Sequence, residues 1–255
     1  QQYLDFFNRA PDKPGEDFWS NEVERCGADA ACRDFRRVNT SGAFFVSIEF
    51  QETGYLVYRA YKAAFGDLAG KPVPVRYDEF MADTQRIGEG VVVNSLGWEQ
   101  KLASNRDAFM LDFVTRTNAT GGRNFATQFP NGTPAATIVD RLFQNAGVVP
   151  LDAERQALIA ELAPNPDSPA LRASVLRKVA ESPLLVRQEF MKAFVLMQYF
   201  GYLRRNPDDA PEANRDFAGY SFWLGKLQEN GGDFHRAEMV RAFIESIEYR
   251  QRFRE

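Results

Sequence analysis

Among the side-chain types that carry out chemistry, histidine is the scarcest in this 255-residue sequence. His235 is the single histidine, so any catalytic triad or Cys/His pair would have to include it. It follows the turn residues Gly231-Gly232-Asp233, where we expect a helix to begin. No nearby Ser or Cys has the sequence context of a nucleophile. We therefore expect either a solvated imidazole or one adjacent to a helix cap, and we predict that the chain is not an enzyme.

Acidic side chains gather in one predicted loop, where the chemistry to consider is calcium binding. Calcium takes six or more oxygen ligands, and this loop offers Asn206, Asp208, Asp209 and Asp216. Their spacing lacks the regular Asp-x-Asp-x-Asp-Gly pattern of a calcium loop. Calcium is therefore a minor alternative to helix capping. Carboxylate pairs such as Glu16-Asp17 are likewise more typical of caps and solvated faces than of acid–base catalysis. We predict no cofactor.

The two cysteines, Cys26 and Cys32, enclose a short loop of Gly, Ala and Asp residues. Thiols six positions apart do not share a straight helix face, but they close a small loop between two helices if their α-carbons come within about 7 Å. We predict a disulfide, with two free thiols as the alternative. A disulfide indicates an oxidising compartment. Two cysteines and the distant His235 do not make a zinc site.

The composition is that of a globular protein, with 44% hydrophobic and 26% charged residues. The net charge of −4 argues against a nucleic-acid partner, because neutralising phosphates is the main source of affinity in such complexes. A membrane helix needs about 20 apolar residues in a row, and the longest apolar run, 193–203, is broken by Gln198 and Gly201. We expect no membrane span. Because the chain begins without Met and inside a helical pattern, we interpret it as a processed product or a piece of a longer protein.

The two ends of the chain carry the same sequence motif, and an internal repeat is the strongest signal that one sequence can give. Three blocks recur in the same order: 3–12, 15–19 and 44–50 near the N-terminus, and 199–208, 219–223 and 243–249 near the C-terminus. The matched positions are Arg9, Asp12, Gly15, Trp19, Ser47, Glu49 and Phe50 in the first copy, and Arg205, Asp208, Gly219, Trp223, Ser246, Glu248 and Tyr249 in the last. The copies differ mainly in loop length, which is where insertions are tolerated.

Two weaker copies between these ends share only the layout of the motif. We place the segments at 1–52, 53–117, 133–190 and 191–255, each with three helices whose apolar residues recur at helical spacing. This predicts an all-α fold of about twelve helices in four tandem three-helix units that pack on their neighbours. We expect one domain, or at most two with a boundary near Thr117 to Thr133. Val91-Val92-Val93 resembles a strand but is too short to form a sheet.

Helix starts are marked by short polar residues. We expect Asp12, Asp152 and Ser168 to be N-caps, because their side chains accept hydrogen bonds from free backbone N–H groups. Pro169 follows Ser168 at the first helical position, where proline is favoured.

The repeated Arg-x-Pro-Asp turn suggests a structural role for charged residues. We predict that Arg9 pairs with Glu49, and that Arg205 pairs with Glu248, so that the first helix of each end segment is held to the third. We expect Trp19 and Trp223 to be core residues of the second helices, with sugar stacking as the alternative.

The blocks around 3–12, Gly15, Phe18-Trp19 and Ser47-Ile48-Glu49-Phe50 resemble the bacterial domain of unknown function 4214, which is similar to the phycobilisome linker repeat. The resemblance covers less than half of the chain. It implies a helical bundle, often at the end of a longer chain, and an extracellular or cell-surface location. It brings no catalytic residues with it. The inner segments lack the Phe-Trp pair, having Asp78-Glu79-Phe80 and Leu158-Ile159 in its place.

Three functions fit these observations. The one we favour is a non-catalytic extracellular module that mediates protein–protein assembly or self-assembly within a larger secreted or surface protein. The second is a carbohydrate-binding or carbohydrate-active domain with a carboxylate pair in an aromatic cleft. The third is a linker subunit of a photosynthetic antenna complex, which the acidic charge does not favour.

Overall fold

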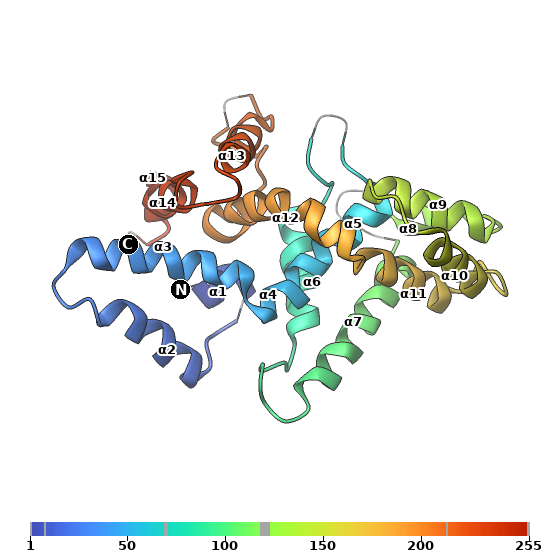
Figure 1. Cartoon of the computed structure of the whole chain (residues 1–255), viewed down its shortest axis with the longest axis horizontal. Helices are drawn as coiled ribbons and strands as arrows, with labels where there is room; N and C mark the ends of the chain where they lie inside the picture. Colours follow the sequence, from blue (N-terminus) through green and yellow to red (C-terminus); the bar gives the residue numbers. More distant parts are fainter. Residues whose placement is uncertain (1, 8, 69–70, 118–122, 213, 254–255) are drawn as a thin grey trace. The chain divides into compact units, whose positions relative to one another are not determined.

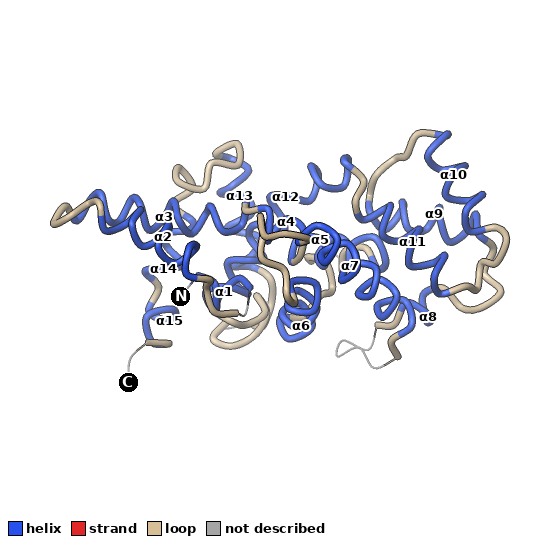
Figure 2. Tube along the Cα trace, turned by 90° about the horizontal axis from the view of Figure 1, so that it is seen from below, coloured by secondary structure: helices blue, strands red, loops and turns tan. Residues whose placement is uncertain are grey.

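The computed structural model describes residues 2–7, 9–68, 71–117, 123–212 and 214–253. Within these residues the chain is helical and contains no strand (Figure 2). The prediction of an all-α fold is therefore confirmed. Val91–Val93 forms turns, with Val91 N–H bonded to the Gly88 carbonyl and Ser95 N–H bonded to the Val92 carbonyl. No helix in the described part of the chain is long and apolar enough to cross a membrane.

The chain divides into two compact units. Unit 1 combines the two ends, Gln1–Gln51 and Met191–Glu255, and unit 2 is the middle, Glu52–Phe190. The expected boundary near Thr117 to Thr133 is not where the division falls, because residues on both sides of that segment belong to unit 2. The division instead falls close to the inner edges of the two segments that share the sequence motif.

Unit 1 is built from helices of both ends of the chain (Figure 1). From the first end it takes α1 (Gln2–Phe7), α2 (Lys13–Glu24), α3 (Ala30–Val46) and most of α4 (Ile48–Glu52). From the last end it takes the second half of α12 (Pro183–Gln198), the π-helical turn η1 (Tyr199–Leu203), α13 (Ala218–Glu229), α14 (Met239–Glu245) and α15 (Ile247–Gln251).

Aromatic rings from the two ends meet in the core of unit 1. Phe6 of α1 and Tyr202 of η1 pack edge to face, with ring centres 5.4 Å apart, and Phe45 and Phe194 do so at 4.7 Å. These four side chains are at most 3% exposed. Each aromatic side chain buries roughly 150–250 Å², so burial between the two ends contributes to the stability of unit 1.

A buried carboxylate also joins the two ends. Asp5 of α1 is 1% exposed. Its oxygens accept hydrogen bonds from Arg252 Nη2 at 2.7 Å and from the Tyr249 hydroxyl at 3.3 Å. A buried charge is tolerated only when it is paired and hydrogen-bonded, so these contacts fix the C-terminal helix α15 against α1.

Unit 2 surrounds one buried helix. Helix α5 (Gly54–Phe65) is buried along nearly its whole length and packs against α6, α9 and α11. Its fully buried neighbour Glu189 accepts a hydrogen bond from the Tyr58 hydroxyl at 2.8 Å. The other helices of this unit are α6 (Tyr77–Gly88), α7 (Trp98–Thr115), α8 (Phe125–Gln128), α9 (Ala135–Ala146), α10 (Asp152–Leu162) and α11 (Pro169–Ala180), with the first half of α12.

Polar caps define several helix starts. Asp12 and Ser168 accept hydrogen bonds from the N–H groups of Gly15 and Leu171, as predicted. The prediction for Asp152 was wrong: Leu151 is the capping residue, and Asp152 lies in the first turn of α10. An acidic residue there still interacts favourably with the positive end of the helix dipole.

Cys26 and Cys32 form the predicted disulfide, with α-carbons 5.6 Å apart, between the end of α2 and the start of α3. Asp29 lies inside the closed loop and caps α3 by accepting a hydrogen bond from Cys32 N–H at 3.0 Å. The disulfide therefore fixes the angle between α2 and α3.

Replacing both cysteines by serine should lower the free energy of unfolding of unit 1 by about 2 kcal/mol, the chain-entropy value for so short a loop. We suggest urea unfolding followed by fluorescence in a Trp98→Phe background, in which both remaining tryptophans lie in unit 1. Reducing agent should destabilise the parent protein by the same amount and leave the double variant unchanged. Equal stability of the two proteins without reductant would contradict this role.

Candidate interaction site

The same arginine–glutamate clamp is present at both ends of the chain. Arg9 Nε and Nη2 donate to the two carboxylate oxygens of Glu49 at 2.8 and 2.7 Å. Arg205 donates in the same way to Glu248, at 2.6 and 3.1 Å. Both predicted ion pairs are therefore confirmed. A two-bond contact of this kind fixes orientation as well as distance, so it sets the geometry between the end of the first helix and the start of the last.

The side chains of both clamps are more buried than those of ordinary surface ion pairs. The Arg9 and Glu49 side chains are 25% and 11% exposed, and those of Arg205 and Glu248 are 11% and 30% exposed. Burial alone would lower the pKa of each guanidinium, but the hydrogen bonds and negative charge of the paired glutamate outweigh it and raise the pKa overall. Both arginines stay fully charged, which the paired carboxylate requires.

The serine of the motif links two helices at each end. Ser47 Oγ donates to the Phe44 carbonyl at 2.7 Å and accepts from Phe50 N–H at 3.2 Å. Ser246 Oγ makes the matching bonds to the Phe243 carbonyl and from Tyr249 N–H, at 2.8 and 3.0 Å. One hydroxyl thus ends one helix and caps the next. The glutamate that follows is thereby positioned for the clamp.

The glycine of the motif makes room for a tyrosine. A Cβ atom on Gly15 would overlap the Tyr3 hydroxyl, and one on Gly219 would lie 2.6 Å from the Tyr199 hydroxyl. Burial raises the pKa of both tyrosines, because an ionised ring would be poorly solvated there. Each ring also lies under the guanidinium of its own segment, Arg9 or Arg205. The glycine therefore allows the second helix to approach the clamp closely.

The tryptophans of the motif are only half-buried, and this corrects the prediction that they are core residues. Trp19 packs on Phe44 with ring centres 5.2 Å apart, and Trp223 packs on Phe243 at 5.8 Å. Each second helix touches the rest of its segment along one side, and α2 contains no fully buried residue. The indole rings consequently contribute packing while keeping part of their surface accessible.

The acidic residue of the motif differs from the prediction. In the first segment Asp12 lies near both Gly15 and Arg9. In the last segment Glu212 occupies this place, with its carboxylate 3.1 Å from Arg205 Nη2 and next to Gly219. The sequence match predicted Asp208 at this place. The loop of the last segment is longer than that of the first, so a residue further along the chain, Glu212, lies there instead.

Three of the four residues considered for calcium, Asn206, Asp209 and Asp216, form cap and turn contacts. Asp209 Oδ2 accepts from the backbone N–H and the side-chain amide of Asn206, at 2.9 and 2.7 Å. Asp216 accepts from Ala218 N–H at 3.0 Å, at the start of α13. Among the described residues, no group of three or more His, Cys, Asp or Glu side chains is arranged to hold a metal ion. Asp208 thus joins no such group.

His235 lies where the two ends of the chain meet. Its Nε2 is 2.5 Å from Asn39 Oδ1, and its ring stacks on Phe35 with centres 5.3 Å apart. The imidazole is thus packed and hydrogen-bonded rather than solvated, because α3 runs alongside this turn, and the backbone N–H of His235 donates to Asp233 at 2.9 Å. Sequence patterns alone did not indicate this contact, since Asn39 is nearly 200 residues away.

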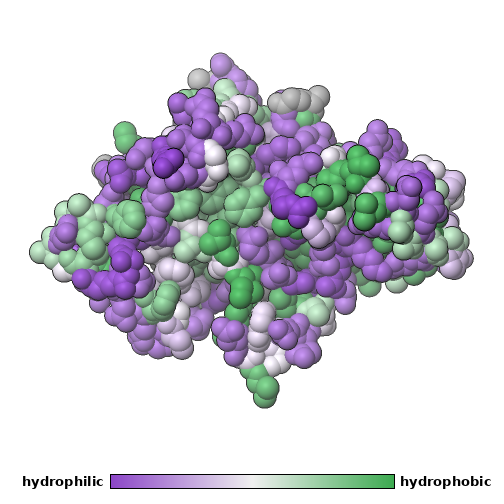
Figure 3. Space-filling model, viewed as in Figure 1, coloured by the Kyte–Doolittle hydropathy of each residue, from purple (hydrophilic) through white to green (hydrophobic). Residues whose placement is uncertain are grey.

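Two apolar positions are exposed in both end segments. The side chain of Phe18 is 58% exposed and that of the matching Phe222 is 55% exposed, each edge-on against the tryptophan that follows it. Ile48 and the matching Ile247 are 54% and 72% exposed. Hydrophobic residues reach the surface at several places among hydrophilic ones (Figure 3). We call Phe18 and Ile48 the first apolar pair, and Phe222 and Ile247 the second. The sequence matched these positions but did not indicate their exposure.

Comparisons of the chain with protein families, with curated proteins and with solved structures found no match.

Replacing Gly219 by alanine should cost about 1–3 kcal/mol of unfolding free energy, because the new methyl group overpacks the Tyr199 hydroxyl. The cost should shrink in a Tyr199→Phe background, which removes the overlapped oxygen. Gly225→Ala on the same helix is the matched control. Its Cβ would meet nothing within 4 Å, and alanine should gain up to about 1 kcal/mol there. Equal effects at the two glycines in urea unfolding would refute the steric role.

A double-mutant cycle on Arg205→Met and Glu248→Gln should give a coupling free energy of about 1–2 kcal/mol, since the pair is mostly shielded from water. Arg9→Met and Glu49→Gln should give a similar value. The exposed pair Lys226 and Glu229 is the control, and its coupling should be within about 0.5 kcal/mol of zero. Coupling at the two clamps no larger than at this control would show that they do not fix the fold.

Proposed function

We propose that this chain is a non-catalytic interaction module that joins proteins into a larger assembly, and that unit 1 supplies two equivalent contact surfaces. The observation that carries the proposal is the exposure of matched apolar residues, Phe18 with Phe222 and Ile48 with Ile247. Single exposed hydrophobic residues are common and need no explanation. Exposure of the same two positions in both segments is a pattern, and a pattern of this kind is expected of a repeated contact surface.

The physical cost of these exposed side chains supports a binding role. Leaving a large apolar side chain in water forgoes about 1.5–3 kcal/mol relative to burying it. The clamp, the serine cap and the tyrosine contact involve none of these four side chains, and the edge-on contacts of Phe18 and Phe222 with the tryptophans leave more than half of each phenylalanine exposed. Large apolar side chains held on a rigid frame are well suited to protein interfaces, where aromatic anchors contribute much of the binding energy.

A unit with two equivalent contact surfaces can bind a partner at both surfaces at once, which is bivalent binding. If each surface binds the same kind of partner, the second contact forms at a high effective concentration and the overall affinity exceeds that of either surface alone. The same geometry permits self-assembly, in which each copy of the chain contacts two others.

The repeat and the family resemblance are part of this proposal. The matched contacts of the two end segments support a common three-helix unit. In the middle of the chain, 53–117 contains α5, α6 and α7, and 133–190 contains α9, α10 and α11 before α12 begins. These inner segments use other ion pairs, such as Arg116 with Asp83 at 2.9 Å. We propose that they are diverged copies related to the phycobilisome-linker-like domain of unknown function 4214.

We also propose an extracellular or cell-surface location. The disulfide supports it, because such bonds persist mainly in oxidising compartments.

The exposed aromatic pairs also raise the alternative of carbohydrate binding. Sugars stack on flat aromatic faces, yet each indole here has a phenylalanine ring against it and a second one edge-on. This arrangement favours an irregular protein surface over a sugar ring. A role in a photosynthetic antenna also remains a prediction, and the net charge of −4 does not favour it.

The test is the association state of the chain as a function of concentration. Sedimentation velocity should reveal reversible self-association, weakened at least about tenfold when Phe18 and Phe222 are both replaced by serine, because anchors of this kind contribute more than 1.4 kcal/mol each. Leu96→Ser is the matched control, since Leu96 is fully exposed on a loop of unit 2.

If the parent chain is monomeric, the proposal is tested by crosslinking the parent and the same variants to their partners in native material. The partners captured by the parent should be lost from the double variant and kept by Leu96→Ser. A monomer whose crosslinked partners do not depend on Phe18 and Phe222 would overturn the proposal.

A further inference from the structure

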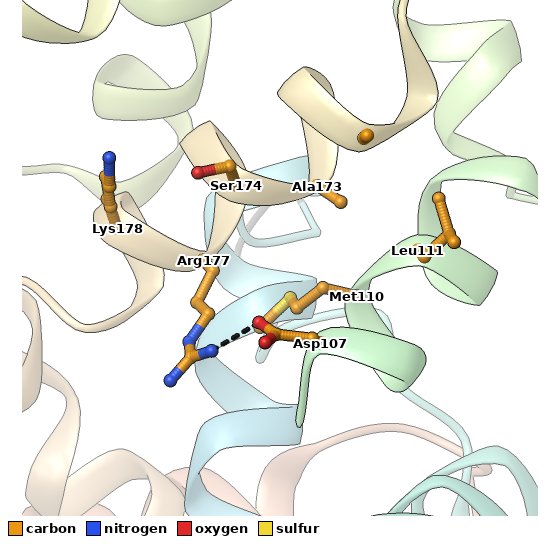
Figure 4. Close-up of a pocket in the computed structure, with 8 residues that line it drawn as sticks. Asp107, Met110, Leu111, Ala173, Ser174, Arg177 and Lys178 are labelled. Atoms are coloured by element: carbon orange, nitrogen blue, oxygen red, sulfur yellow. Dashed lines mark hydrogen bonds and ion pairs between the residues drawn. The ribbon is translucent and has the colours of Figure 1, made fainter. Parts of the chain in front are cut away.

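A cavity of about 310 Å³ lies between α7 and α11 of unit 2 (Figure 4), and it opens to solvent. Its size falls at the lower end of the range of small-molecule sites. The hollow exists because α11 presents small side chains there, Ala170, Ala173 and Ser174, where larger ones would fill the space against α7. It is separate from both apolar pairs, which lie in unit 1.

The cavity is apolar inside and charged at its rim. Met110 and Ala173 are buried at 1% and 6% exposure, while Leu111 is 44% exposed. Asp107, Arg177 and Lys178 complete the lining. A site of this composition suits a molecule with an apolar body and one charged end.

The ion pairs of the rim residues indicate which sign of charge the ligand should carry. Lys178 Nζ is held by Glu161 at 2.6 Å, and Figure 4 shows its side chain directed away from Asp107 and Arg177. Arg177, which also lines the cavity, is directed towards Asp107 and donates to it at 2.5 Å, while its Nε donates to Glu181 at 3.0 Å. Arg177 is thus the cation that a ligand in this cavity would meet.

The pairing of Arg177 with Asp107 is easily exchanged. The Asp107 side chain is 70% exposed, and exposed ion pairs contribute at most about 1 kcal/mol. An incoming carboxylate can replace that of Asp107 on the guanidinium, which then keeps a charge-assisted partner, while Asp107 regains full hydration. The apolar part of the ligand would cover Met110 and Leu111 and displace water from them.

From these contacts we infer that the cavity between α7 and α11 binds a small carboxylate with an apolar body, of the size of a medium-chain fatty acid. When the site is empty, the Asp107 carboxylate accepts the Arg177 hydrogen bond that the ligand carboxylate would otherwise accept. The site is independent of the assembly role proposed for unit 1.

Titration of the full-length chain with octanoate tests this inference, with the methionine methyl groups observed by NMR after isotope labelling. The Met110 methyl, assigned with Met110→Leu, should shift saturably with a Kd on the order of 1 mM, as expected for a ligand of roughly ten heavy atoms. Octanamide, which lacks the charge, should bind at least about fivefold more weakly. Failure of the Met110 signal to shift by about 10 mM octanoate, or equal binding of the amide, would overturn the site.

Two variants locate the binding contacts. Ala170→Leu, at an exposed position of α11 that should tolerate it, should abolish the Met110 shift by filling the cavity. Asp107→Asn should tighten octanoate binding about two- to fivefold, because the competing carboxylate is gone, and should leave octanamide binding unchanged. Unaltered octanoate binding in Ala170→Leu, or weaker binding in Asp107→Asn, would contradict the proposed contacts.

Discussion

Unit 1 depends on a single type of interaction, a two-bond arginine–glutamate clamp that joins the first and last helices of each end segment. The clamp stabilises a geometry more than it adds net stability, because burying two charges costs much of what their attraction returns. The main effect of the clamp is to position the residues around it. The tyrosine under the guanidinium, the glycine beside that tyrosine and the serine before the glutamate all depend on the same two charges being held together.

The two clamped segments complete each other. Phe6 and Tyr202 pack on each other across the two segments, and Asp5 of the first segment is hydrogen-bonded by Tyr249 and Arg252 of the last. The two segments also differ in the hydrogen bonds of one matched pair of glutamines. Gln2 Oε1 accepts a hydrogen bond from Tyr202, whereas Oε1 of the matching Gln198 is buried without a partner. The residue that matches Tyr202 in the first segment is Phe6, which has no hydroxyl to donate.

Much of this arrangement could be predicted from the sequence, and the successes share one physical basis. The disulfide, the caps at Asp12 and Ser168 and the two Arg–Glu pairs are either local or repeated, so spacing alone reveals them. The failures concern contacts between distant parts of the chain. The pairing of the two ends, the packing of His235 against α3 and the place of Glu212 beside Arg205 depend on loop paths that composition and periodicity do not fix.

Exposure was the second property that the sequence did not determine. Trp19 and Phe18 are both large and apolar, and a helical pattern assigns them to a buried face. Helix α2, however, contacts its segment along one side only, which leaves Phe18 in solvent and Trp19 half-covered. The cavity beside Met110 was equally hidden, because Ala170, Ala173 and Ser174 appear as ordinary helix residues until α7 is placed opposite them.

The first and last segments fold as one cooperative unit, in which each clamp orders its own segment and the shared core joins the two. Hydrogen–deuterium exchange of the Glu248→Gln variant tests it most directly, because only the last segment is altered. We expect faster exchange in α14 and α15 and also in α1 and α3, with the protection of α5, α7 and α11 unchanged. Faster exchange confined to the last segment, or spread equally through residues 52–190, would contradict it.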